Sequence, residues 1–157
     1  MKNLFKSLSL VVISLLVFSC SESPEKMIVG KWTSSDIEFT NAEKMIEQQI
    51  AQYPDSVKEM AKAQMTQTLE DQRKSFQNGI LAINFKEDKK YETTSNNNAA
   101  DNGTWKLSED LKTLTTTSEK AKQDDNFKIE LLEAKKMIIV SGADSDPVKM
   151  TFVKSEK

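Results

Sequence analysis

The sequence contains no histidine among its 157 residues. This absence excludes a Ser-His-Asp triad, a Cys-His pair, a His-ligated zinc or haem and an imidazole acid-base catalyst. Cys20 is the single cysteine, so no disulfide can form within one chain. There are only four glycines, and no G-x-S-x-G element, phosphate-binding glycine loop or S-x-x-K element occurs. We therefore expect neither an enzyme nor a cofactor.

The chain also lacks a strong charge of one sign, with 22 Lys and Arg against 24 Asp and Glu. No stretch gathers basic residues with interleaved aromatics, so nucleic acid is not an expected partner. Two acidic stretches, Asp124-Asp125-Asn126 and Asp144-Ser145-Asp146, lack the 12-residue spacing of an EF-hand loop. We interpret both as solvated turns, and we expect no metal site.

The apolar stretch over residues 8–18 is too short to span a bilayer, which needs about 20 residues. Lys2 and Lys6 precede it and Leu16-Val17-Phe18-Ser19-Cys20 closes it, as in a secretory signal. The ending resembles a bacterial lipobox, in which a cysteine is acylated and becomes the new N-terminus. We expect residues 1–19 to be cleaved, Cys20 to carry the lipid anchor and residues 20–26 to form a polar tether. The alternative is an incidental thiol after an ordinary signal.

The residues after the cysteine bear on the location of the anchored protein. Ser21 stands where, by the enterobacterial rule, an Asp would retain a lipoprotein on the inner membrane, and Glu22 resembles the acidic export tags of Bacteroidota lipoproteins. We expect a cell-envelope protein held on the outer membrane by its acyl chains, on the periplasmic or the surface face.

Alternating apolar residues predict a first strand from about Met27 to Phe39. Trp32 lies on one parity of this strand, whereas Ile37 and Phe39 lie on the other. A period of two cannot otherwise change faces, so we predict a bulge near Ser34 and Ser35.

A helical insert is predicted over 41–78. Thr40 and Glu43 have capping-box spacing, and apolar residues then recur at helical intervals. Pro54 interrupts the run because it lacks an N–H and disfavours helix at the residue before it. The pattern therefore predicts two helices, about 41–53 and 55–77, with the second ending at Asn78-Gly79.

From Gly79 onward the hydrophobic period is two, and turn residues separate seven further short strands. With the first strand the total is eight. Closure of such strands into a barrel removes the open edges of a flat sheet. We predict a mainly β fold: an antiparallel eight-stranded barrel over residues 27–157, with a two-helix insertion between strands 1 and 2.

The motif Gly30-Lys31-Trp32, with the segments 102–107 (which contains Trp105) and 111–114, resembles the lipocalin-like domains of secreted Bacteroidota lipoproteins. The resemblance covers most of residues 27–154. It implies that Trp32 packs across the closed end of the barrel, with direct ligand contact as the alternative role. The helices between the first two strands are closer to intracellular fatty-acid-binding proteins, in which a helix-turn-helix covers the barrel mouth, although those proteins have ten strands.

One side of the predicted helices is rich in methionine, and we call it the Met-rich face. It comprises Met45, Ile46, Ile50, Tyr53, Val57, Met60, Met65 and Leu69. Methionine adapts to irregular apolar shapes, so we expect Met45, Tyr53, Met60, Met65 and Leu69 to contact a hydrophobic ligand. The alternative is that this face simply covers an open barrel end.

Asp55-Ser56-Val57 resembles the acceptor sequence of O-glycosylation in Bacteroidota, which makes Ser56 a candidate acceptor. Helix capping and the macrodipole explain an Asp and a Ser after a proline equally well.

Two functions are compatible with these patterns. The first is a membrane-anchored lipocalin-like lipoprotein that binds a small hydrophobic ligand without catalysis. The second is an envelope interaction protein with a filled barrel and a protein partner. Inward-facing residues distinguish them: large ones such as Phe85, Trp105, Phe127 and Phe152 favour a filled interior.

Anchoring is predicted to depend on Cys20. A Cys20→Ala protein should lose incorporated acyl label and leave the membrane fraction, because the remaining chain has no other predicted anchor. Radiolabelled or clickable fatty acid and cell fractionation measure both effects. Retention of the variant in the membrane with normal processing would contradict the lipobox assignment.

Overall fold

The computed structural model describes residues 23–96, 98–142 and 146–155, so Cys20 and the predicted signal peptide lie outside the described residues. Eight antiparallel strands form a closed barrel in which each strand pairs with its chain neighbour and the last pairs with the first. This confirms the predicted fold class. The strands are β1 (Gly30–Phe39), β2 (Leu81–Phe85), β3 (Lys90–Ser95), β4 (Asn98–Leu107), β5 (Thr113–Ser118), β6 (Asp124–Leu132), β7 (Lys136–Ser141) and β8 (Val148–Lys154).

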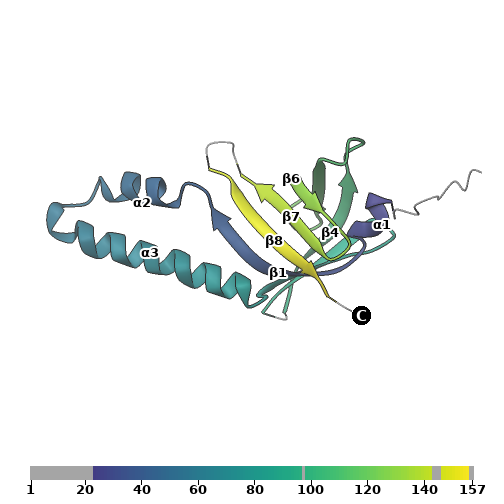
Figure 1. Ribbon diagram of the computed structural model, residues 1–157, viewed down its shortest axis with the longest axis horizontal. Coiled ribbons are helices and arrows are strands. Elements are labelled where there is room, and N and C mark those ends of the chain that lie inside the picture. Colours follow the sequence, from purple (N-terminus) through teal and green to yellow (C-terminus); the bar gives the residue numbers. More distant parts are fainter. Residues whose placement is uncertain (1–22, 97, 143–145, 156–157) are drawn as a thin grey trace, which may run out of the picture.

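Three helices accompany the barrel: α1 (Pro24–Ile28), α2 (Ala42–Ile50) and α3 (Asp55–Gln77). The first precedes β1, and the other two form a hairpin between β1 and β2 (Figure 1). Within the described residues, none of these helices is long and apolar enough to cross a membrane.

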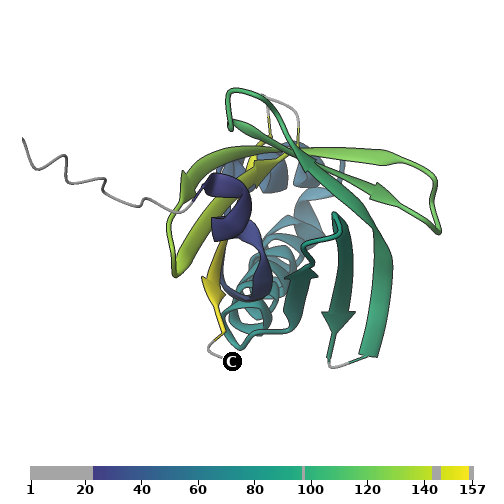
Figure 2. The ribbon, with the colours of Figure 1, turned by 90° about the vertical axis from the view of Figure 1, so that its right-hand side faces the viewer.

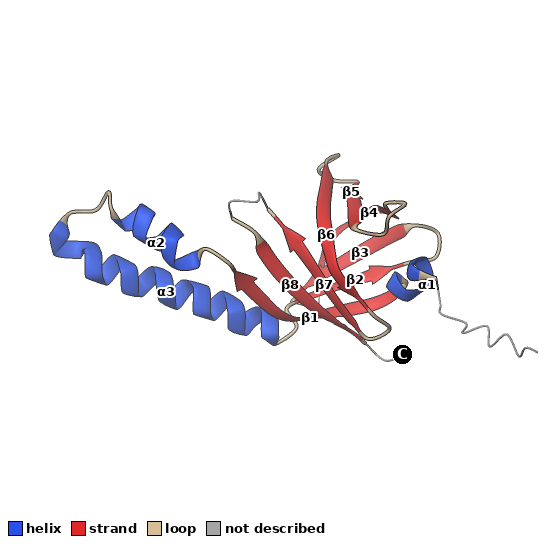
Figure 3. Ribbon diagram, turned by 45° about the horizontal axis from the view of Figure 1, so that its top comes forward, coloured by secondary structure: helices blue, strands red, loops and turns tan. Residues whose placement is uncertain are grey.

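The barrel has two distinct ends. Because the strands are antiparallel, the turns β2–β3, β4–β5 and β6–β7 lie at the end where β1 begins, beside α1 (Figure 3). We call this the α1 end. The helical hairpin leaves from the opposite end, which we call the hairpin end.

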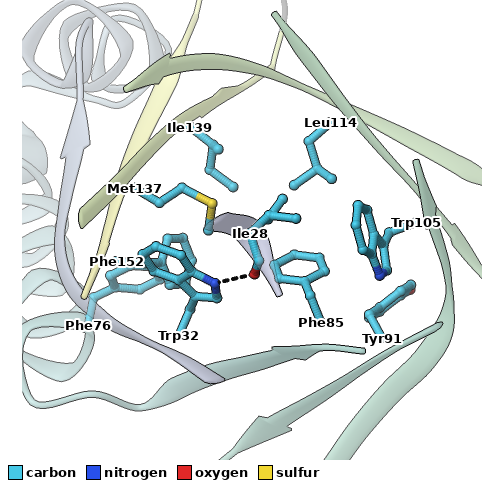
Figure 4. Packing of buried hydrophobic residues seen from close by; sticks show 10 residues of the cluster. All are labelled: Ile28, Trp32, Phe76, Phe85, Tyr91, Trp105, Leu114, Met137, Ile139 and Phe152. Carbon is cyan, nitrogen blue, oxygen red and sulfur yellow. Dashed lines mark hydrogen bonds between the residues drawn. The ribbon is translucent and has the colours of Figure 1, made fainter. Parts of the chain in front are cut away.

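A one-turn helix closes the α1 end, where a strand was expected from Met27. Ile28 is fully buried, and its carbonyl oxygen accepts a hydrogen bond of 2.6 Å from Nε1 of Trp32 (Figure 4). Nζ of Lys154 donates a bond of 2.7 Å to the carbonyl oxygen of Met27. The view along the barrel in Figure 2 places α1 over this end. The chain therefore turns into β1 only at Gly30, and the expected tether is shortened by the helix.

Gly30 and Trp32 lie side by side with Lys154 at the α1 end. Gly30 has φ +127°, and a Cβ there would meet Cε of Lys154 at 2.8 Å. This close approach lets Nζ of Lys154 lie 5.1 Å from the centroid of the fully buried Trp32 ring. Trp32 therefore packs at the closed α1 end of the barrel.

Trp105 completes a second, similar arrangement in the core. Its Nε1 donates a 3.1 Å bond to the carbonyl oxygen of Lys86, Nζ of Lys89 lies 4.3 Å from its ring centroid, and Phe85 packs edge-on against it. Lys89 also pairs with Glu25 of α1 at 2.8 Å. Both tryptophans thus connect the barrel wall to the α1 end.

The expected change of parity in the first strand is present. The register of β1 against β8 shifts between Ser34 and Asp36, so that Ile37 and Phe39 point to the same side as Trp32. The bulge places the Ser34 hydroxyl where it donates a 2.8 Å bond to the carbonyl oxygen of Phe76. This bond fixes the end of α3 against the barrel.

The two inserted helices form within three residues of their predicted limits, but two details differ. The capping box of Thr40 and Glu43 is wrong: α2 begins after Asn41, and no side-chain hydrogen bond caps it in the described structure. The hairpin also extends away from the barrel instead of covering its mouth (Figures 1 and 3). At about 1.5 Å per residue, the 23 residues of α3 extend about 35 Å, and Phe76 near its C-terminus is buried in the barrel core.

Trp32→Ala is expected to lower the free energy of unfolding by roughly 3–5 kcal/mol, the usual cost of truncating a large buried aromatic. It would also leave the carbonyl oxygen of Ile28 without its indole donor. Chemical denaturation followed by circular dichroism measures the effect. A midpoint equal to that of the parent would contradict the role of Trp32 in closing the barrel.

Candidate functional site

An apolar groove of about 650 Å³ lies between α2 and α3. All five residues predicted from the sequence to contact a ligand line it, namely Met45, Tyr53, Met60, Met65 and Leu69. Ile46, Val57 and Ala61 complete its apolar surface, and Phe39 at the end of β1 lies at its base. The structure therefore brings the predicted residues together, between the two helices and away from the barrel interior.

The groove is unusually open for an apolar surface. Met60 is 68% exposed, Met45 48% and Tyr53 41%, although each is a large hydrophobic side chain. Ile46 and Ile50, by contrast, are buried where α2 packs on α3. Ile46 and Ile50 thus pack within the hairpin, whereas Met45 and Met60 are available for contact.

Polar contacts hold the groove in place from outside. Nζ of Lys62 on α3 pairs with Oε1 of Glu47 on α2, and this hydrogen bond raises the pKa of Lys62. Oδ1 of Asp36 on β1 accepts bonds from Gln77 at 3.1 Å and from Arg73 at 3.3 Å, both on α3. Burial opposes ionisation of Asp36, but these two bonds outweigh it and keep its pKa below the ordinary value.

Large side chains fill the barrel interior at the α1 end. Phe85, Trp105 and Phe152 are buried, so large side chains fill the α1 end. Phe127, together with Ile83, is only partly buried and packs against that core. Three of the four aromatic residues that the sequence analysis used to distinguish a filled barrel from a ligand cavity are therefore buried, which favours a filled interior at the α1 end.

A polar cluster that the sequence analysis missed lies on the inner face of β3, β4 and β5. Oη of Tyr91 donates a 2.8 Å bond to Oδ2 of Asp101, and Oγ of Ser118 donates a 2.9 Å bond to Oδ1. Asp101 has the same parity on β4 as Gly103 and Trp105. That parity was the available signal, whereas the composition of the Asp101-Asn102-Gly103 segment is typical of a turn.

The electrostatics of this cluster favour a structural role. Burial opposes the charge on Asp101, but the two hydroxyl donors outweigh it and hold its pKa below the usual 3.8. Burial, and then the neighbouring carboxylate, raise the pKa of Tyr91 far above its usual range. Neither group changes protonation near neutral pH, so neither is poised for acid-base catalysis. The described residues also contain no group of three or more His, Cys, Asp or Glu side chains arranged to hold a metal ion.

Ser56 lies in the first turn of α3 and is exposed, as the acceptor hypothesis requires. Asp55 beside it pairs with Lys58 at 2.7 Å. Within the described chain, no side-chain hydrogen bond caps α3, so the capping explanation is not supported. Glycosylation of Ser56 stays a prediction.

No protein-family model matches the chain, and no curated protein matches it. Among solved structures, it is similar to a DUF4847 family protein from Bacteroides vulgatus ATCC 8482, determined by crystallography at 1.00 Å. The two are 14% identical, the match covers 85% of this chain and 97% of that one, and the TM-score is 0.47. These values neither assign the chain to that family nor transfer a function, so function is argued from the site.

The Tyr91–Asp101 pair predicts a pH dependence of stability. A carboxyl whose folded pKa is lowered stabilises the fold above its unfolded pKa, and this contribution is lost as the pH falls through the folded value. Tyr91→Phe removes a donor to Asp101, so it should lower the free energy of unfolding at neutral pH by roughly 1.5 kcal/mol and reduce the further loss in acid.

Denaturation series at neutral pH and at steps below about pH 4 measure both effects. Tyr53→Phe is the matched control, because Tyr53 is 41% exposed in the groove and should leave both values unchanged. Equal acid sensitivity of Tyr91→Phe and the parent would show that the pair does not stabilise the ionised carboxyl.

Proposed function

We propose that this protein is a lipid-anchored, non-catalytic binding module that holds a small hydrophobic ligand in the groove between α2 and α3. The observation that carries the proposal is the convergence of Met45, Tyr53, Met60, Met65 and Leu69 on one apolar groove, in which Met45, Tyr53 and Met60 remain exposed. A contiguous exposed apolar patch, unlike a single exposed apolar side chain, marks a binding or interaction site.

The shape and chemistry of the groove are consistent with a small apolar ligand. A volume of about 650 Å³ falls within the usual range of roughly 300–1,000 Å³ for small-molecule sites. Unbranched, polarisable methionine side chains adjust to ligands of different outline. Gln49 and Gln64 at the groove supply amide groups that can orient a polar head.

The groove is a better ligand site than the α1 end of the barrel. Trp32, Phe85 and Phe152 are each no more than 1% exposed, so a ligand would have to displace a packed core. The groove needs no such rearrangement because its surface is already open. The proposed ligand site is therefore in the insert, and the barrel is its support.

A protein partner is the second candidate, and the 68% exposure of Met60 on a projecting hairpin favours it. An amphipathic helix that lays its apolar face between α2 and α3 would bury the same residues as a small ligand. In that case the protein is an envelope interaction protein, as the filled α1 end also allows.

Anchoring through acylated Cys20, on the outer membrane, is part of the proposal. α1 begins four residues after Cys20 and is fixed to the barrel by Ile28 and by the Glu25–Lys89 pair. An acylated Cys20 would thus be joined to the folded domain by a short connection.

Native mass spectrometry of the protein purified from its own host distinguishes the two candidates, because a co-purifying small molecule or protein gives a different mass. The groove itself is tested with Met60→Gln together with Met65→Gln. This pair should weaken binding of a fluorescent fatty acid at least about tenfold, since each replacement forfeits apolar burial shared with the ligand.

Met150→Gln is the matched control, because Met150 lies on β8 and packs against the barrel core. Loss of binding in Met150→Gln, with the groove variant unaffected, would place the ligand in the barrel and contradict the proposal. Far-UV circular dichroism must accompany each titration, because an unfolded variant also fails to bind. Absence of saturable binding of fatty acids, sterols and quinones by the parent would remove the small-ligand proposal.

A further inference from the structure

We infer that the α1 end of the barrel rests directly on an anionic lipid surface, so that the helical hairpin points away from the membrane. The inference goes beyond ligand binding and rests on the proposed acylation of Cys20. Three features of the α1 end carry it: the short distance to the anchor, the charge of the rim and an exposed leucine.

The distance follows from chain length. Cys20 lies four residues before Pro24, and at about 3.5 Å per residue this stretch reaches at most about 14 Å. Pro24 begins α1, whose Ile28 is fully buried in the barrel core. The fixed helix cannot move away from the barrel to lengthen the tether. An acyl chain on Cys20 therefore brings the α1 end, and no other face, to the bilayer.

The charge of this end suits an anionic surface. α1 and the three turns around it hold five lysines and six carboxylates, and the strand ends that meet them add five lysines and no carboxylate, namely Lys31, Lys90, Lys106, Lys136 and Lys154. Lys26, Lys31 and Lys136 are exposed, and within the described residues they make no ion pair. At the opposite rim the balance is reversed, because Glu38, Glu119, Asp124, Asp125 and Asp146 outnumber the lysines there. An anionic surface therefore attracts the α1 end and repels the other.

Leu111 supplies an apolar contact at the same end. It lies at the tip of the β4–β5 turn, is 39% exposed and has φ +60°, a conformation that costs a residue with a Cβ. Its N–H donates a 2.9 Å bond to the carbonyl oxygen of Ser108, and Oδ1 of Asp110 accepts bonds from Ser108 and Lys112. The turn is thus a fixed structure in which Leu111 is exposed between Asp110, whose carboxylate is hydrogen-bonded within the turn, and Lys112. An exposed leucine on a fixed turn can insert into a lipid headgroup layer.

The consequence is a defined orientation. With the α1 end on the bilayer, the hairpin end faces away, and α3, which is about 35 Å long, projects from the barrel in that direction beyond its C-terminal part. The apolar groove then lies clear of the membrane, open to a ligand or partner in the aqueous phase.

The experiment uses the full-length, acylated protein purified from its host and placed in vesicles. Ala134→Cys, in the β6–β7 turn of the α1 end, and Gln52→Cys, between α2 and α3, each carry a fluorophore. Acylation blocks the thiol of Cys20, so each variant has one reactive thiol. Quenching by phosphatidylcholine that carries a nitroxide on its headgroup reports the proximity of each label to the bilayer surface. We expect strong quenching at position 134 and little at position 52.

A short tether alone would also place position 134 near the surface, so charge is tested separately. Addition of phosphatidylglycerol to phosphatidylcholine vesicles should increase quenching at 134, and about 1 M NaCl, with a Debye length of about 3 Å, should abolish the increase. Lys31→Glu with Lys136→Glu should also abolish it, since each lysine at an anionic surface contributes about fivefold to binding. Lys120→Glu with Lys122→Glu at the hairpin end is the matched control and should keep it. Leu111→Asn, which tolerates the same φ, should reduce quenching at 134.

Equal quenching at positions 134 and 52 would overturn the orientation. The lysine contact, and with it the inference, would be overturned if quenching at position 134 did not change with lipid charge, with salt or with the Lys31→Glu and Lys136→Glu substitutions. Intact mass measured before reconstitution separates these results from failure of the proposed anchor. A protein without an acyl chain on Cys20 would overturn both the anchoring and this inference, whereas an acylated protein with equal quenching would overturn only this inference.

Discussion

The hydrogen bond from the Trp32 indole to the carbonyl oxygen of Ile28 is the interaction on which the rest of this structure depends. It joins the one-turn helix α1 to the first strand, and both partners are fully buried. A carbonyl left without a donor at this depth would cost roughly 1–3 kcal/mol. Because the bond is made, α1 can close the barrel, and the apolar core behind it stays continuous from Ile28 to Phe152. Lys154 completes the closure by binding the neighbouring carbonyl oxygen of Met27 and covering the Trp32 ring.

Closure of one end determines where a binding site can lie. The core at the α1 end contains both tryptophans and leaves its space to packed side chains. The open apolar surface occurs instead in the hairpin, which is joined to the barrel through Phe76, the Ser34 hydroxyl and the Asp36 carboxylate. These three contacts all lie near the C-terminus of α3. The far part of the hairpin therefore depends on the packing of Ile46 and Ile50 against α3, and its methionines add little to that packing.

Much of this arrangement was predictable from the sequence, because period and parity are local signals. The eight strands and the β1 bulge at Ser34 follow from alternation of apolar residues, and the two helices follow from apolar residues at helical intervals. Helical spacing placed Met45, Met60 and Met65 on one face, and all five residues that the sequence analysis selected from this face line the groove. The direction of the hairpin was not predictable, because the apolar face of a helix does not specify which surface packs against it. The role of Asp101 was missed because a residue in a segment rich in Asn, Asp and Gly has the composition of a turn.

The relation between the two ends follows from topology and holds whatever the groove binds. An antiparallel barrel with an even number of strands returns its last strand to the end at which its first strand began. The residues that follow the predicted anchor and the lysines of the neighbouring strand ends consequently share one end, and the β1–β2 connection lies at the other. An insertion in that connection is as far from the anchor as this fold allows. A long helical hairpin placed there gains reach without disturbing the Trp32 closure, whereas an insertion of the same length in the β2–β3 turn would lie beside α1 and crowd the anchor.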